Sequence, residues 1–229
     1  IFAVSRDELK PALSGVLFQI KNNSILSVST DGHRLVKYTR HGLNIDINRD
    51  VIIPKKFLSL ISSNISQVEN INLYINENQV IVEVGNDIFY SRVIDERFPD
   101  FESVIPKDNN KELIVNRLDL LSTVKRVSVL SNKTTRQIAL NLTKDNIKIT
   151  TEDNEKSSKG FENISGSFTG EDLTIGYNAA YLKDILSHLS TDEIMIKLNS
   201  PISAGLFFPK EQLKDSDLTM LLMPIRLNN

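Results

Sequence analysis

The two halves of the sequence repeat one order of apolar patterns at an offset of about 123 or 124 residues. Leu17 corresponds to Leu140, Phe57 to Tyr181 and Ile71 to Ile194. In each half a hairpin of alternating apolar residues precedes a helical stripe, and further alternating runs follow it. Solenoid repeats have periods of roughly 20 to 50 residues, so a repeat this long indicates duplicated domains. We therefore expect an α+β chain that contains two copies of one unit.

The expected helices are marked by apolar residues at spacings of three and four and by residues suited to a helix start. Pro54 precedes a stripe that begins at Phe57, and proline is well tolerated where a helix begins. In the second half Asn116 is a suitable N-cap for one helix. Another amphipathic stretch covers roughly 178–189. We expect these three segments to be the helices between the strands.

A polar, turn-rich stretch at 106–111 is the best domain boundary in the chain. We therefore expect one domain over 1–106 and a second over 107–229. The length of 229 residues and a hydrophobic content of 40% are sufficient for two domains with real cores.

Composition excludes several classes of protein. The chain has no cysteine, so it has neither disulfides nor a cysteine metal site. It contains no long apolar run of about 18 residues and no secretory signal, so we expect no membrane association and a cytoplasmic location. The formal net charge of −2 argues against a protein that coats nucleic acid with its whole surface. A binder that is basic on one face only is still compatible with this charge.

Few residues suggest catalysis. The three histidines, His33, His41 and His188, have no second ligand at helical or hairpin spacing, and no nucleotide-binding or hydrolase motif is present. Carboxylate pairs such as Asp95-Glu96 are most simply solvated surface in a chain with 29 acidic residues. We expect no cofactor and no metal. A metal-dependent nuclease or another phosphoryl-transfer enzyme is the alternative, because its carboxylates can be scattered along a sequence.

Two further stretches stand out. Asp31-Gly32 lies between alternating apolar runs and predicts a hairpin with a two-residue primed turn, with His33 and Arg34 as adjacent donors. The chain closes on an apolar run, Leu221-Leu222-Met223, followed by Pro-Ile-Arg-Leu, which is unlike a frayed tail. We expect this closing segment to pack against other parts of the protein.

Four motifs in register carry a resemblance to a known family. They are Gly15-Val16-Leu17-Phe18, Thr30 to Leu35, Arg97-Phe98-Pro99-Asp100-Phe101 with Val104-Ile105-Pro106, and Met223-Pro224-Ile225-Arg226-Leu227. Their order and spacing resemble the bacterial DNA sliding clamp family, the β subunit of DNA polymerase III, over essentially the whole chain. The resemblance implies the DNA clamp fold, in which repeated α+β domains each pack two helices on antiparallel β-sheets. It also implies that the chain covers the second domain, without its beginning, and the third domain.

The resemblance implies a non-catalytic processivity factor. In this family a homodimer closes into a ring around double-stranded DNA without reading its sequence, and it acts in the bacterial cytoplasm at the nucleoid. The implied DNA-facing residues are Lys125, Arg126, Lys133 and Arg136, whose simpler interpretation is a solvated helix face. No aromatic residues are interleaved with them, so single-strand binding by base stacking is disfavoured. Val129 and Leu130 match the family's ring interface.

The family also binds its polymerase, clamp loader and repair partners through peptides of the Gln-x-x-Leu-Phe type. Transferred residue by residue, the implied pocket consists of Leu13, Thr30, Gly32, His33, Arg34, Leu35, Pro99, Val104, Asn178, Tyr181, Ile202, Ala204, Leu221, Met223, Pro224, Ile225 and Arg226. Its apolar members are suited to Leu and Phe anchors, with His33 and Arg34 as donors to peptide carbonyls. Core packing is the simpler interpretation of the apolar members. Three positions depart from common family residues: Ser103 in place of Arg, Ala204 in place of Ser, and Ile225 in place of Met.

Overall fold

The computed structural model describes residues 1–45, 47–65 and 70–227 and divides the chain into two compact units. Unit 1 contains Ile1–Phe101 and the short segment Lys214–Asp217, and unit 2 contains Glu102–Leu213 and the chain from Leu218 onward. The division at 101–102 precedes the expected boundary at 106–107 by a few residues, since the 3-10 turn η3 (Glu102–Val104) belongs to unit 2. Each unit is α+β, as the sequence predicts.

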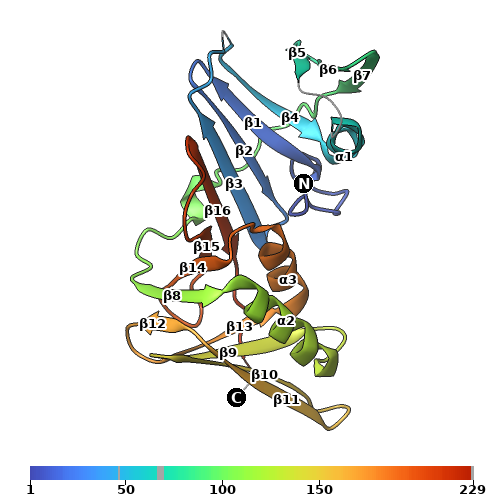
Figure 1. The fold of residues 1–229 in the computed structure, drawn as a ribbon. Helices are drawn as coiled ribbons and strands as arrows, with labels where there is room; N and C mark the ends of the chain where they lie inside the picture. Colours follow the sequence, from blue (N-terminus) through green and yellow to red (C-terminus); the bar gives the residue numbers. More distant parts are fainter. Residues whose placement is uncertain (46, 66–69, 228–229) are drawn as a thin grey trace. The chain divides into compact units, whose positions relative to one another are not determined.

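Unit 1 is built on a four-stranded antiparallel sheet in the order β3-β2-β1-β4. These strands are β1 (Gly15–Lys21), β2 (Ser24–Thr30), β3 (Arg34–His41) and β4 (Arg49–Pro54), and the 3-10 turn η1 (Pro11–Ser14) precedes them. The helix α1 (Lys55–Asn64) follows β4 directly, and a three-stranded sheet β5-β6-β7 completes the unit (Figure 1). That sheet contains β5 (Ile71–Ile75), β6 (Gln79–Val84) and β7 (Asp87–Arg92).

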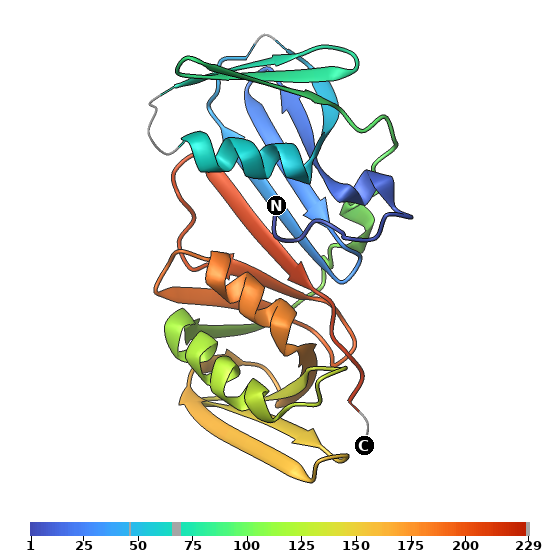
Figure 2. The same ribbon diagram turned by 90° about the vertical axis from the view of Figure 1, so that its right-hand side faces the viewer.

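Unit 2 contains a second four-stranded sheet, in the order β11-β10-β9-β13. Its strands are β9 (Gln137–Thr143), β10 (Asn146–Asp153), β11 (Ser158–Ser165) and β13 (Leu173–Asn178). The strands β12-β8-β14-β15-β16 are hydrogen-bonded neighbours in that order, with β8 (Lys111–Asn116), β12 (Ser167–Thr169), β14 (Glu193–Leu198), β15 (Gly205–Pro209) and β16 (Ser216–Leu222). The helices α2 (Arg117–Val127) and α3 (Ala179–His188) lie side by side, as Figure 1 and Figure 2 show, and the 3-10 turn η4 (Ser128–Leu130) extends α2.

The expected duplication is confirmed strand by strand. The order β3-β2-β1-β4 of unit 1 repeats as β11-β10-β9-β13 in unit 2, and α1 corresponds to α3. The register repeats as well, because Leu17 pairs with Ile52 in unit 1 and Leu140 pairs with Ile175 in unit 2. Within the described residues of unit 1 there is no counterpart of β8 and α2.

The core of unit 1 lies between the apolar face of its helix and the apolar faces of its strands. In unit 1 Phe57 and Ile61 of α1 pack in one cluster with Val80, Val82 and Val84 of β6. The helix α1 ends at Asn64, and Ile65, which follows it, is 37% exposed. The predicted N-cap of α2 forms, because Asn116 Oδ1 accepts from the Asp119 amide at 3.0 Å. Asn178 caps α3 in the same way, with its Oδ1 accepting from the Ala180 amide at 2.9 Å.

The Tyr177 hydroxyl of unit 2 is a buried polar group with no hydrogen-bond partner among the described residues. The Tyr177 side chain is fully buried against Phe207, with ring centroids 6.1 Å apart, and its hydroxyl is unsatisfied. Burial also raises the pKa of this phenol far above its ordinary value. A Cβ atom added at Gly205 would collide with the same hydroxyl oxygen, so Gly205 is required by close approach.

We predict that Tyr177→Phe raises the free energy of unfolding by about 1 kcal/mol, because it removes a buried hydroxyl without a partner. Gly205→Ala should lower it by about 1–3 kcal/mol, and by less in the Tyr177→Phe background, because the collision with the hydroxyl is then gone. Urea unfolding of the two single variants and the double variant measures both effects. Equal costs of Gly205→Ala in the two backgrounds would contradict this account.

Candidate functional site

The residues of the implied pocket fall in both units. Unit 1 contains Leu13, Thr30, Gly32, His33, Arg34, Leu35 and Pro99. Unit 2 contains Val104, Asn178, Tyr181, Ile202, Ala204, Leu221, Met223, Pro224, Ile225 and Arg226.

The strands β2 and β3 form the predicted hairpin, but the two central residues of its turn are not the predicted ones. The Asp31 amide donates to the Arg34 carbonyl at 3.3 Å, so Gly32 and His33 are the central residues instead of Asp31 and Gly32. Gly32 has a φ of 90°, a conformation that glycine adopts at no steric cost. Thr30 Oγ1 closes the turn by donating to the Arg34 carbonyl at 2.7 Å and accepting from the Gly32 amide at 3.1 Å.

The Asp31 carboxylate organises this turn, a role that the sequence pattern did not indicate. Its Oδ1 accepts from the amides of His33 at 2.9 Å and Arg34 at 3.0 Å. Its Oδ2 accepts from Arg34 Nε at 3.0 Å. Asp side chains commonly accept from amides two residues on, so an Asp at the first position of a turn is the signal that could have revealed it.

Arg34 is a buried structural residue of unit 1. Besides its bond to Asp31, its Nη2 donates to the Phe2 carbonyl at 3.0 Å, and the guanidinium lies 5.3 Å from the centroid of the Phe2 ring. The residue is 8% exposed, whereas His33 beside it is exposed. At least two of the Arg34 donors are therefore used inside the unit. Its expected donation to a peptide carbonyl stays a prediction, and His33 is the more accessible donor of the two.

The apolar pocket residues divide into buried and exposed members. Leu35 and Leu221 are 1% and 2% exposed and belong to the cores of their units. Val104, Ile202 and Met223 are 53%, 68% and 42% exposed, so their side chains are open to a ligand. Exposed apolar side chains of this size are the members of the set that a binding partner would bury.

The closing segment of the chain is extended but leaves the sheet. The strand β16 ends at Leu222, and the only further pairing described for the segment is an isolated antiparallel bridge between Ile225 and Gly176 of β13. Pro224, which lacks an amide donor, accounts for the interruption after Leu222. Asn178, another implied pocket residue, is occupied as a helix cap and donates from Nδ2 to the Thr135 carbonyl at 3.3 Å.

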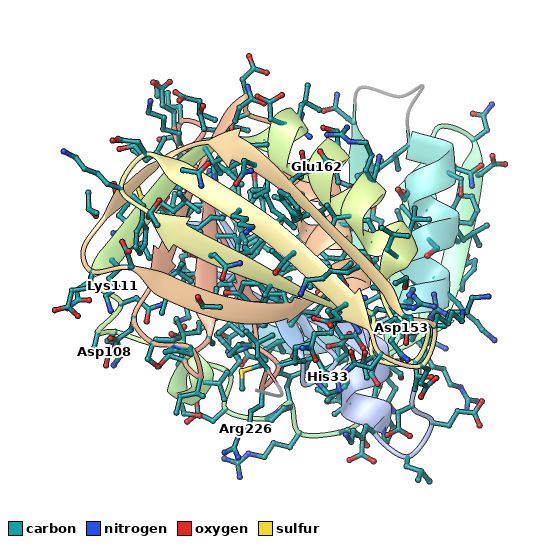
Figure 3. The ribbon with its side chains drawn as sticks, turned by 90° about the horizontal axis from the view of Figure 1, so that it is seen from below. His33, Asp108, Lys111, Asp153, Glu162 and Arg226 are labelled. Atoms are coloured by element: carbon teal, nitrogen blue, oxygen red, sulfur yellow. The ribbon has the colours of Figure 1, made fainter. Side chains whose placement is uncertain are left out.

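The implied DNA-facing cations all lie at the end of α2 and in the loop that follows it. Lys125, Lys133 and Arg136 are exposed, and Arg136 has a φ of 50°. Arg126 is different, because it forms a fork with Glu162 of β11: Nε to Oε1 is 2.9 Å and Nη2 to Oε2 is 2.7 Å. Glu162 is labelled in Figure 3. This pairing cancels the charge of Arg126 locally, which the sequence did not reveal.

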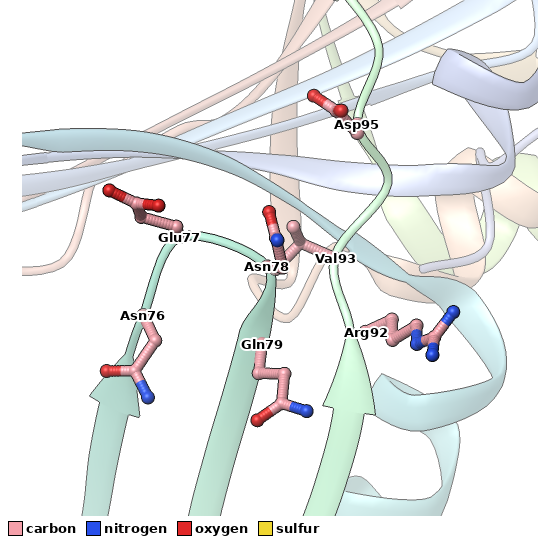
Figure 4. A pocket seen from close by; sticks show the side chains of 7 residues that line it. All are labelled: Asn76, Glu77, Asn78, Gln79, Arg92, Val93 and Asp95. Atoms are coloured by element: carbon pink, nitrogen blue, oxygen red, sulfur yellow. The ribbon is translucent and has the colours of Figure 1, made fainter.

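A hollow in unit 1 contains none of the predicted site residues. It measures about 830 Å³ and is lined by Asn76, Glu77, Asn78, Gln79, Arg92, Val93 and Asp95 (Figure 4). Its lining is polar and of mixed charge, and it lies at the β5–β6 turn and the end of β7. Among the described residues no group of three or more His, Cys, Asp or Glu is arranged to hold a metal ion. No helix in the described part of the chain is both long and apolar enough to span a bilayer.

Two family models match the chain. The model of the central domain of the DNA polymerase III beta subunit matches residues 1–100, and the model of its C-terminal domain matches residues 102–226. The beta sliding clamp of Haemophilus influenzae is 31% identical over 227 residues, and that of Pseudomonas putida is 28% identical over 228 residues. Both alignments cover 99% of this chain but 61% of the relative.

Solved structures give the same relationship. The sliding clamp from Bartonella birtlesii, bound to griselimycin, is 31% identical to this chain, and the two structures superpose with a TM-score of 0.90. The matched region covers 99% of this chain and 61% of the Bartonella chain. The clamp from Bacillus subtilis is 28% identical with a TM-score of 0.92, over 99% of this chain and 60% of its own. This chain therefore spans about three fifths of the length of these relatives.

We predict that Asp31→Ala lowers the free energy of unfolding by about 1–3 kcal/mol, because it removes acceptors from two amides and from the buried Arg34 side chain. Asp31→Asn should cost less, since its side-chain oxygen can still accept from the amides. Urea unfolding at neutral pH measures the difference. Equal losses for the two variants would show that the carboxylate does not act through these amides.

The Arg126–Glu162 fork should make stability depend on pH. Arg126 lowers the pKa of the Glu162 carboxyl, chiefly by hydrogen bonding, so this group stabilises the fold above its ordinary pKa of 4.5 and loses that contribution as the pH falls through the lowered value. Arg126→Gln should therefore reduce the urea midpoint at pH 7 but leave it nearly equal to the parent's at strongly acidic pH. Lys125→Gln is the matched control. A deficit of Arg126→Gln that is independent of pH would contradict the assignment.

Proposed function

Since this chain belongs to the family of the DNA polymerase III beta subunit, we propose that it forms the central and C-terminal domains of a DNA sliding clamp. The observation that carries the proposal is the duplicated α+β unit, which both domain models of that family match in order. A clamp tethers a polymerase to its template and catalyses no reaction itself. The proposed place of action is the bacterial cytoplasm, at the nucleoid.

The proposed interaction with DNA is topological and electrostatic. A ring of two complete subunits encircles the duplex, so weak phosphate contacts suffice and the clamp can slide. Lys125, Lys133 and Arg136 are exposed cations that support this role through contacts to phosphates without base readout. Arg126 contributes less, because Glu162 already neutralises it. Binding of this kind weakens as salt concentration rises.

The proposed ring interface lies at the 3-10 turn after α2. Val129 is 80% exposed and Leu130 is 40% exposed, and a second subunit would cover both side chains. These two residues belong to unit 2, and their partner surface is proposed to come from the first domain of the other subunit. The homodimer is therefore a property proposed for the longer protein.

The proposed partners bind through short peptides of the Gln-x-x-Leu-Phe type, carried by the replicative polymerase, the clamp loader and repair proteins. The exposed side chains of Val104, Ile202 and Met223 support this proposal, because they are apolar surface suited to Leu and Phe anchors. Methionine adapts to ligands of different shape, which suits a site shared by several partners. The relative from Bartonella birtlesii binds griselimycin, so a member of this family holds a ligand.

The test is a titration of the chain with a fluorescein-labelled Gln-Ala-Ala-Leu-Phe peptide by fluorescence polarisation. We expect saturable binding that disappears when Leu-Phe is replaced by Ala-Ala. Met223→Ala should weaken binding about tenfold, corresponding to the loss of about 1.4 kcal/mol from one buried side chain. Leu118→Ala, which truncates another exposed apolar side chain in unit 2, should leave the affinity unchanged.

The outcomes are distinct. If the parent chain binds the peptide and Met223→Ala weakens binding no more than Leu118→Ala does, the proposed contact at Met223 is wrong. Absence of binding to both peptides would contradict the proposed docking function for this chain. The family membership, which rests on the two domain models, would be unaffected. The DNA interaction is tested separately, by retention of a complete ring on circular DNA.

A further inference from the structure

The closing segment of the chain meets the edge of a sheet at one residue. The strand β13 is an edge strand of the sheet β11-β10-β9-β13, and β9 is its neighbour in that sheet. The Ile225 amide donates to the Gly176 carbonyl on β13 at 2.9 Å, and the two residues form an isolated antiparallel bridge. Three residues of the proposed peptide site, Met223, Pro224 and Arg226, flank this bridge.

Gly176 is needed for close approach and not for its backbone conformation. It is not among the glycines with a positive φ. A Cβ atom at this position would lie 2.6 Å from the Ile225 carbonyl oxygen and 2.7 Å from Leu227 Cδ2. Because one of these atoms belongs to the backbone, a larger residue could be accommodated only by moving the closing segment. A lone glycine inside a strand is the known sign of such an approach.

Leu227 makes a second contact at the same place. Its side chain lies over Gly176 and lines a hollow of about 460 Å³ on the sheet. Ala139 and Asn141 of β9 and Thr150 of β10 line the same hollow. The closing segment is therefore attached to β13 by two contacts: the backbone hydrogen bond of Ile225 and the side-chain contact of Leu227 with Gly176.

We propose that Gly176 and Leu227 form a latch that fixes the closing segment and thereby positions the peptide site. This inference rests on the proposed docking function and adds to it a residue, Gly176, that contacts no peptide in the proposed site. A segment that is already ordered loses little conformational entropy when a ligand binds. Without the latch, the same residues would have to be ordered at each binding event, and affinity would fall. Gly176 is thus a positioning residue.

The experiment compares the parent chain with Gly176→Ala, Leu227→Ala and the double variant. Thr174→Ala is the matched control, because Thr174 is an exposed residue of the same strand. The first measurement is amide hydrogen exchange of Ile225 by NMR, and the second is affinity for the labelled Gln-Ala-Ala-Leu-Phe peptide. Leu227→Ala leaves β13 intact, so it tests the latch even if Gly176→Ala disturbs the strand.

We expect faster exchange at Ile225 and about tenfold weaker peptide binding in both single variants. The double variant should be little worse than either single variant, because both changes open one latch. Thr174→Ala should leave both measurements unchanged.

Unchanged exchange at Ile225 in both single variants would overturn the latch. Faster exchange with unchanged affinity would overturn the positioning role, and tighter binding would show that the segment blocks the site instead. If the parent chain binds no peptide, the docking function and the positioning role fail together. The exchange measurement still decides separately whether the latch exists.

Discussion

The burial of one face of an antiparallel four-stranded sheet is the constraint on which both units depend. In unit 2, Leu140, Ile149 and Ile175 come from three neighbouring strands and are at most 1% exposed. Because side chains alternate along a strand, shifting any register by one residue would turn these groups to solvent. The helix α3 completes this core with Leu182 and Ile185, which are fully buried. Unit 1 has the same arrangement, a four-stranded sheet in the same strand order followed by the helix α1.

The periodic features of the fold could be predicted from the sequence. Alternation identified the strands that carry Leu17 and Leu140, and Asn116 and Asn178 were recognised as residues that begin helices. These predictions succeeded because the signals are local: a pleated strand or a helix turn imposes its period on neighbouring residues. The matched offset then gave the duplication, and the family resemblance gave the identity of the two domains. The roles of the pocket and DNA-facing residues stay predictions. For the members whose side chains are exposed, that accessibility to a ligand supports the predicted role.

The features that the sequence did not reveal all depend on contacts between distant residues. Glu162 neutralises Arg126 across 36 positions, and no local pattern distinguishes this carboxylate from the others. Arg34 looks like a ligand donor in the sequence, yet its side chain bonds the Phe2 carbonyl and is buried. Gly176 had a readable sign, because a lone glycine in a strand indicates close backbone approach, but the chain segment that approaches it could not be identified in advance.

The grouping of Lys214–Asp217 with unit 1 has a consequence for how the chain is made. At the end of β3, the His41 amide donates to the Asp215 carbonyl at 2.8 Å, and Arg40 Nη1 donates to the Lys214 carbonyl at 2.9 Å. A ribosome delivers β3 long before it delivers these acceptors, because nearly all of unit 2 lies between them. Unit 1 therefore leaves the exit tunnel with an open strand end that is vulnerable to wrong pairing. The hydrogen bonds that complete the end of β3 can therefore form only after Lys214 and Asp215 have been synthesised.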